Sequence, residues 1–166
     1  MSESVLQVRD LRVEYATPNG PAQAVGGVSF DVARGEFLAI VGESGCGKST
    51  LLFAIAQLLT YPGSVAGGSV FFDGVDFMSL SPEELRIHRW RDISVVMQSA
   101  MNALNPTLTI GAQLADACKA HTDWSSEHIA QRSAEVLAMV AIDAVHLRSY
   151  PFQLSGGMRQ RAMIAM

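Results

Sequence analysis

Residues 42–49, GESGCGKS, form the segment of the sequence with the clearest chemistry. They match the pattern G-x-x-x-x-G-K-[ST], in which glycines let successive backbone N–H groups point at one anion. A helix that begins here would add the positive end of its dipole to these donors. Lys48 would reach the β- and γ-phosphates of a nucleotide, and the Ser49 hydroxyl would hold Mg²⁺. The segment therefore predicts a site for nucleotide phosphates.

The context of this phosphate loop is the one that the motif requires, because an apolar run precedes it and an apolar helical pattern follows it. The residues expected to contact nucleotide here are Gly42, Ser44, Gly45, Cys46, Gly47, Lys48, Ser49 and Thr50. The Cys46 thiol would lie close to bound nucleotide, so alkylation of Cys46 is expected to block ATP binding.

A second helix start with exposed backbone donors occurs at LSGGM, residues 154–158. Ser155 is a good N-cap, and the two glycines after it would let another backbone approach. The apolar residues that follow recur at helical spacing on one face: Met158, Ala162, Ala165 and Met166. The segment therefore predicts a helix whose N-terminus is open to an anion.

Local patterns predict a β-rich first part, and a mainly helical second part from about residue 99. Strands are predicted at 5–15, 24–32, 37–41 and 93–97, and a hairpin at 69–77 with Asp73-Gly74 as its turn. The runs 37–41 and 93–97 are wholly apolar, which is typical of strands buried on both faces. Residues 63–68, GSVAGG, are predicted to form a loop.

Helices are predicted from periodicity and capping signals. The apolar run 51–60 indicates a buried helix, and the capping box from Ser81 to Glu84 begins a helix that reaches about Arg91. Two more helices are indicated by the apolar spacing from Ile110 to His121 and by the N-cap Ser125.

Composition places the chain among globular proteins. It has 166 residues, 49% of them apolar and 17% charged, and a formal net charge of −4, which argues against a general nucleic-acid binder. The N-terminus lacks the basic and apolar regions of a signal peptide, and no apolar run approaches the ~18 residues that span a bilayer. The two cysteines fit no metal spacing, which favours free thiols in a reducing compartment, and the four histidines are scattered.

Three segments together resemble the nucleotide-binding subunit of an ABC transporter. They are the phosphate loop, Gln98 directly after the predicted strand 93–97, and LSGGM, which looks like the family's LSGGQ signature with Met in the last place. Their order and spacing match over the whole chain. The stretches 98–114 and 150–161 resemble the branch that powers bacterial importers of di- and oligopeptides, which also includes nickel importers.

The resemblance implies an α/β fold, the ABC-type nucleotide-binding domain of P-loop NTPases, with a parallel core sheet, an antiparallel β subdomain and a helical subdomain. Residues 1–98 would form the β subdomain and phosphate-loop core, 99–157 the Q-loop and helical subdomain, and 158–166 the start of the helix after the signature. The family's Asp-Glu strand and later His have no counterpart after Gly157. We therefore expect a single incomplete ATP-binding domain that lacks its general base, is unstable without a partner, and alone shows no ATPase activity above background.

The resemblance also implies roles for matched residues. Lys48 and Gln98 would be catalytic, with Ser49 and Gln98 holding Mg²⁺ through ATP, and Tyr15 would stack on adenine, although it can also be an ordinary strand tyrosine. Residues 99–121 would line the groove for the membrane partner's coupling helix. The signature residues Ser155, Gly156 and Gly157 would act in trans, on ATP held by the phosphate loop of a second subunit.

The function implied is that of an ATP-binding subunit, which in complete form hydrolyses ATP to drive peptide uptake through two membrane-spanning permease subunits. A similar paralogue would be the second ATP-binding subunit, and an extracytoplasmic solute-binding protein would act indirectly. The subunit would lie peripherally on the cytoplasmic face of the bacterial plasma membrane, and no nucleic acid is expected as a partner. Two alternatives stay open: a truncated, non-hydrolytic ATP-binding remnant and a nickel importer subunit. ATPases of DNA repair and chromosome maintenance are disfavoured, because only about a hundred residues, without heptads, separate the two motifs.

Overall fold

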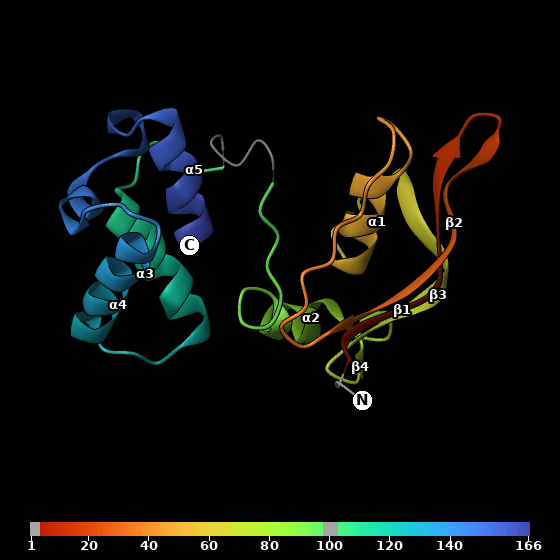
Figure 1. The fold of residues 1–166 in the computed structure, drawn as a ribbon, viewed down its shortest axis with the longest axis horizontal. Coiled ribbons are helices and arrows are strands. Elements are labelled where there is room, and N and C mark those ends of the chain that lie inside the picture. Colours follow the sequence, from red (N-terminus) through yellow and green to blue (C-terminus); the bar gives the residue numbers. More distant parts are fainter. Residues whose placement is uncertain (1–3, 98–102) are drawn as a thin grey trace. The chain divides into compact units, whose positions relative to one another are not determined.

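The computed structural model describes residues 4–97 and 103–166, which form two compact units divided between Arg86 and Ile87 (Figure 1). The first unit is built on a β-sheet, and the second is mainly helical. Each unit is described by itself below. The subdomain boundaries expected after residues 98 and 157 stay predictions. No helix formed by the described residues is both long and apolar enough to cross a membrane.

The first unit contains a four-stranded antiparallel sheet in the order β2-β1-β3-β4. Its strands are β1 (Ser4–Thr17), β2 (Gly20–Ala33), β3 (Gly63–Phe72) and β4 (Val75–Asp76). The predicted hairpin is confirmed: Phe72 pairs with Val75, and the two turn residues between them both have positive φ, as this tight turn requires. The predicted loop at 63–68 is wrong, because those residues belong to β3 and pair with β1.

A bulge in β1 explains how its apolar residues reach one face of the sheet. Val8 and Leu11 are both fully buried although they are three residues apart, and simple alternation would put them on opposite faces. Asp10, between them, has φ 45°, and the register with both neighbouring strands shifts at this point. The extra residue restores the alternation. Gly68 of β3 allows it, since a Cβ there would lie 2.5 Å from the Asp10 carbonyl oxygen.

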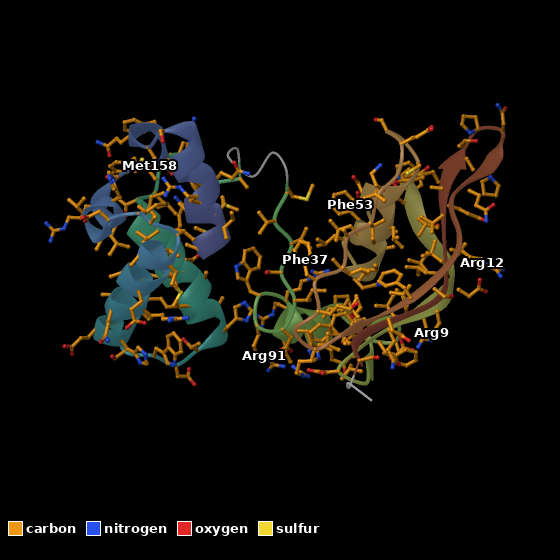
Figure 2. All side chains as sticks on the ribbon, in the orientation of Figure 1. Arg9, Arg12, Phe37, Phe53, Arg91 and Met158 are labelled. Carbon is orange, nitrogen blue, oxygen red and sulfur yellow. The ribbon has the colours of Figure 1, made fainter. Side chains whose placement is uncertain are left out.

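Helix α1 (Lys48–Ile55) follows the phosphate loop and lies against the sheet (Figure 1). It buries Leu51, Ala54 and Ile55, whereas Arg9 and Arg12 project from the face of the sheet away from α1 (Figure 2). The helix is shorter and less buried than predicted: it ends at Ile55, and Leu52 is 44% exposed. The apolar run 51–60 thus overstates the length of the helix.

The strands predicted at 37–41 and 93–97 are not formed. Among the described residues no strand pairs with 37–41, and Phe37 is 96% and Val41 87% exposed. In 93–97 only Ile93 makes a bridge, to Arg89, and Val96 and Met97 are exposed. An apolar run becomes a strand only where a neighbouring strand takes up its N–H and C=O groups, and the four strands of the described sheet pair with one another instead.

Helix α2 (Pro82–His88) begins at the predicted capping box: the Ser81 N–H donates to Glu84 Oε2 at 2.8 Å, and the Glu84 N–H donates to Ser81 Oγ at 3.3 Å. It ends at His88, earlier than predicted. After the helix, Asp92 accepts a hydrogen bond from Arg91 and shares one with His88. The hydrogen bond from Arg91, with a smaller contribution from His88, holds the pKa of the Asp92 carboxyl below its usual range.

The second unit confirms the predicted helices at 110–121 and after Ser125 as α3 (Ile110–His121) and α4 (Ser126–Met139). The short helices η2 (Ala144–Arg148) and η3 (Pro151–Gln153) lead to α5 (Gly156–Ala165). Their shared core consists of Leu104, Ile110, Leu114, Leu137, Ile142, Leu154 and Ala162. The apolar face predicted for α5 packs against this core, because Met158, Ala165 and Met166 contact it as well.

Candidate functional site

The phosphate loop closes around the side chain of Lys48. The Lys48 Nζ donates hydrogen bonds to the carbonyl oxygens of Gly42, at 2.8 Å, and of Glu43, at 2.6 Å. The Cys46 N–H donates to the Glu43 carbonyl at 3.3 Å, which tightens the turn between them. The ammonium group therefore lies inside the curve of the loop, at the N-terminus of α1.

Three glycines permit this curve. Gly45 and Gly47 have φ of 83° and 95°, in the left-handed region that side chains with a Cβ rarely adopt. Gly47 is the N-cap of α1, and a Cβ there would lie 2.6 Å from the carbonyl oxygen of Ala24 in β2. A Cβ at Gly42 would lie 2.7 Å from Cys46 Sγ, so the thiol fills the space that this glycine leaves. A side chain is therefore excluded by contact at Gly42 and Gly47, whereas at Gly45 the space is open and only the left-handed φ disfavours one.

Tyr15 joins the phosphate loop from β1. Its hydroxyl shares a 3.2 Å hydrogen bond with Oγ1 of Thr50, in the first turn of α1. The Tyr15 ring also lies against Gly63, where a Cβ would meet Tyr15 Cε1 at 2.9 Å. The structure thus brings together Tyr15 and Thr50, which the sequence placed 35 residues apart. This contact fixes the tyrosine at the edge of the loop.

The residues of the loop fit an anion of the polyphosphate class. The N-cap of α1 is Gly47, which has no side chain to accept a hydrogen bond from the helix. The first N–H groups of α1 are therefore not capped by a side chain and can donate to an anion. Lys48 adds a positive charge, and the hydroxyls of Ser49 and Thr50 stand in the first turn. Ser49 is exposed, so its hydroxyl can reach a metal ion that phosphate oxygens also hold. Gln98, the other residue predicted to hold Mg²⁺, lies outside the described residues, as do Ser99 to Asn102 of the predicted coupling groove.

The signature segment forms the predicted helix start in the second unit. Ser155 is the N-cap of α5, and its Oγ accepts a hydrogen bond from the Met158 N–H at 3.3 Å. Gly157 lies in the first turn with helical geometry, and a Cβ there would meet nothing within 4 Å. This helix start is therefore open on the side of Gly157, in contrast to the crowded backbone at Gly47.

A rigid turn leads into the signature. Pro151 and Leu154 are buried, and the Gln153 side chain accepts a 2.8 Å hydrogen bond from the Tyr150 N–H. Between these anchors Phe152 is 70% exposed and stacks on Tyr150, with ring centroids 5.7 Å apart. The two buried anchors hold Ser155 in place relative to the helical core.

The predicted site residues thus divide between the two units. Tyr15 and the phosphate loop belong to the first unit, and Ser155, Gly156 and Gly157 belong to the second. Sequence reasoning missed one residue next to the signature, Arg161, whose guanidinium binds backbone carbonyls at the end of α4. No local pattern could have found it, because its partners are backbone atoms about twenty residues away.

Comparison with known proteins shows the family to which the chain belongs. Residues 25–166 match the family model described as ABC transporter. The chain is 46% identical to the dipeptide transport ATP-binding protein DppD of Bacillus subtilis, over 99% of the chain and 50% of that protein. It is 40% identical to the oligopeptide transport ATP-binding protein OppD of Escherichia coli, over 99% of the chain and 49% of that protein. The chain spans about half the length of the curated relatives it matches.

Solved structures resemble the chain closely. The dimeric structure of MJ0796, described as a bacterial ABC transporter cassette, superposes with a TM-score of 0.84 at 30% identity, covering 96% of this chain and 67% of that one. A dimeric post-hydrolysis state of the MJ0796 cassette, bound to ADP and Pi, gives a TM-score of 0.81 at 28% identity, with the same coverage. These likenesses confirm the ABC cassette fold, of which the antiparallel sheet and the helical unit are the parts formed here.

Proposed function

The chain belongs to the ABC transporter family, and we propose that it is the ATP-binding part of an importer of peptides. The observation that carries the proposal is the phosphate loop, with Lys48 Nζ held by two loop carbonyls at the glycine-capped N-terminus of α1. Peptide is favoured as the solute because the DppD and OppD relatives are named for dipeptide and oligopeptide transport.

Within this function each residue has a distinct task. Lys48 and the N–H groups of residues 42–50 bind the phosphates, and Tyr15 holds the base by stacking. Bound Mg²⁺ would neutralise charge on the phosphates, with Ser49 and Gln98 as the residues that hold it. Lys48 stabilises negative charge that develops as the terminal phosphoryl group leaves, and Gln98 orients the attacking water.

The signature residues act on the nucleotide of a second subunit. Ser155, Gly156 and Gly157 present a hydroxyl and helix N–H groups that can bind phosphate oxygens. The dimeric MJ0796 cassettes support a second ATP-binding subunit as the partner. Two permease subunits would receive the resulting motion at the cytoplasmic face of the plasma membrane, and an extracytoplasmic solute-binding protein would deliver the peptide. Hydrolysis by the whole protein, whose relatives are about twice as long as this chain, is part of the proposal.

Binding of a fluorescent ATP analogue tests the nucleotide site. The chain should bind the analogue with 1:1 stoichiometry in the presence of Mg²⁺, and Lys48→Ala should weaken that binding by about tenfold to hundredfold. Lys119→Ala is the matched control, because it removes the same charge from an exposed position in α3. Equal binding by the wild-type chain and by Lys48→Ala would overturn the proposed site.

Uptake measured in the bacterium that carries the gene tests the solute. Introducing Lys48→Ala at the natural locus should remove uptake of a labelled dipeptide and leave uptake of the corresponding free amino acid unchanged. Unchanged dipeptide uptake, with the altered protein present at wild-type level, would contradict a role in peptide import.

A further inference from the structure

Helix α4 ends in a conformation that leaves backbone carbonyl groups exposed to a donor. Its C-cap is Val140, and the next residue, Ala141, has φ 54° in the left-handed region. The last carbonyls of a helix have no partner within the helix, and they carry the negative end of its dipole. A cation that reaches this end gains both hydrogen bonds and dipole energy.

Arg161 of α5 supplies that cation. Its Nη1 donates hydrogen bonds to the carbonyl oxygens of Val140 and Ala141, each at 2.8 Å. The bond to Val140 is partly buried, so solvent competes less for it than for the bond to Ala141, which is exposed. Hydrogen bonds from an ionised donor are stronger and shorter than neutral ones. Arg161 therefore joins α5 to the C-terminus of α4 through two directional contacts.

The position of this joint along α5 matters because the same helix begins with the signature. Arg161 lies six residues after Ser155, which is about 9 Å along the axis at 1.5 Å per residue. The apolar contacts of α5, from Met158 and Ala162 to the core, hold the helix against its neighbours. The two hydrogen bonds from Arg161 Nη1 to backbone carbonyls add a directional restraint on the rotation and the axial position of the helix. Because the signature N–H groups belong to the first turn of α5, the direction in which they point depends on these two hydrogen bonds.

We propose that Arg161 is a positioning residue that aims the signature at the nucleotide of the second subunit. Its task is distinct from phosphate binding, since its guanidinium is committed to α4. The role in nucleotide engagement rests on the proposed function, whereas the effect of Arg161 on the order of α5 does not.

Hydrogen exchange tests the positioning by itself. Arg161→Met keeps the length of the stem and removes the donors, and the amides of residues 158–162 should then exchange at least tenfold faster than in the wild-type chain. Arg161→Lys keeps the charge and a donor, and should restore most of the protection. Arg132→Met, which removes an exposed partner of Glu135 on α4, is the matched control and should leave these amides unchanged. Wild-type exchange rates in a folded Arg161→Met chain would overturn the proposal, whether or not the chain binds ATP.

A second measurement separates positioning from binding. In the presence of a slowly hydrolysed ATP analogue, the affinity for nucleotide measured with monomeric chain should be the same in Arg161→Met and in the wild type. Analogue-dependent self-association should weaken at least tenfold in Arg161→Met and recover in Arg161→Lys. Unchanged association of the Met variant would overturn the role in aiming the signature. Absence of nucleotide binding by the wild-type chain would instead count against the proposed function, and the exchange result would still decide the positioning.

Discussion

The chain contains two glycine-rich helix starts that differ in how their backbone is held. At α1 the N-cap is Gly47, with φ 95° and no side-chain hydrogen bond, and the loop before it encloses the Lys48 ammonium. At α5 the N-cap is Ser155, in extended conformation, and its own hydroxyl accepts from the helix. The first start is crowded at its cap, whereas the second has open space beside Gly157.

Under the proposed function, this difference assigns the two helix starts different parts in nucleotide binding. A charged, glycine-rich loop can bind a polyphosphate by itself, because its donors and its cation are arranged before the ligand arrives. A neutral serine cap with an open glycine carries no charge to hold an anion alone, but it lets another molecule approach its N–H groups closely. Under the proposed function, the α1 start is suited to primary binding of the nucleotide and the α5 start to completing the site of another subunit.

Substituting one glycine at each site should give effects of opposite sign. Gly47→Ala should destabilise the chain by more than about 2 kcal/mol and remove ATP binding, because it combines a left-handed φ with a Cβ 2.6 Å from the Ala24 carbonyl oxygen. Gly157→Ala should stabilise α5 by up to about 1 kcal/mol and leave ATP binding unchanged. Thermal melting measures the stability of each variant, and nucleotide titration measures its ATP affinity. Equal melting temperatures of the two variants would contradict the difference proposed between the two helix starts.

Removing the charge should affect binding more than stability. Lys48→Ala should lower ATP affinity by about tenfold to hundredfold, the equivalent of the 1.5–3 kcal/mol of a charged hydrogen bond. The melting temperature should change little, since among the described contacts Lys48 bonds only to atoms of its own loop, two carbonyls and the Cys46 sulfur. Calorimetric titration gives the affinity. A large loss of melting temperature would mean that Lys48 holds the loop together and is not mainly a ligand for phosphate.

Alkylation of Cys46 should show whether the nucleotide lies at the phosphate loop before α1. Cys46 is exposed, and its Sγ lies 3.5 Å from Lys48 Nζ, so a maleimide adduct would fill the mouth of the loop. We expect alkylation to block ATP binding and bound ATP to slow the reaction. Cys46→Ser should bind ATP and resist the reagent, which leaves Cys118 as the control thiol. Unaltered ATP affinity after complete modification of Cys46 would place the nucleotide away from this thiol.

The smallest expected effect is at the N-cap of α5. Ser155→Ala should cost about 1 kcal/mol of stability, the usual value of a lost side-chain cap, while Ser155→Asn should retain most of it. Neither variant should alter ATP affinity in the monomeric chain. Urea denaturation measures the cost, and a change in monomer affinity would show that Ser155 acts in cis.

Local chemistry accounts for what the sequence predicted well. The capping residues Ser81, Ser125 and Ser155 and the turn Asp73-Gly74 determine the backbone within a few residues, and each appears as predicted. The phosphate loop belongs to this class, because its glycines and Lys48 interact with one another over six residues.

Non-local pairing accounts for what was missed. The strand assignment of 37–41 depended on neighbours that the run itself does not specify, and the bulge at Asp10 depends on Gly68 in another strand. The contact of Arg161 with the end of α4 joins residues 20 and 21 positions apart. In these places the tertiary partner decides the local structure, and periodicity carries no information about it.

A mixing experiment tests most directly whether the phosphate loop before α1 binds the nucleotide and the signature at α5 completes the nucleotide site of a second chain. Lys48→Ala has a disabled phosphate loop and an intact signature, whereas Gly157→Asp keeps an intact phosphate loop and places a carboxylate, in open space, where it repels phosphate. With a slowly hydrolysed ATP analogue and Mg²⁺, sedimentation should show dimers of the wild-type chain, monomers of each variant alone, and dimers again when the two variants are mixed, because one composite site is then whole. A mixture that stays monomeric under conditions where the wild-type chain associates, or a wild-type chain that binds the analogue and never associates, would contradict the account.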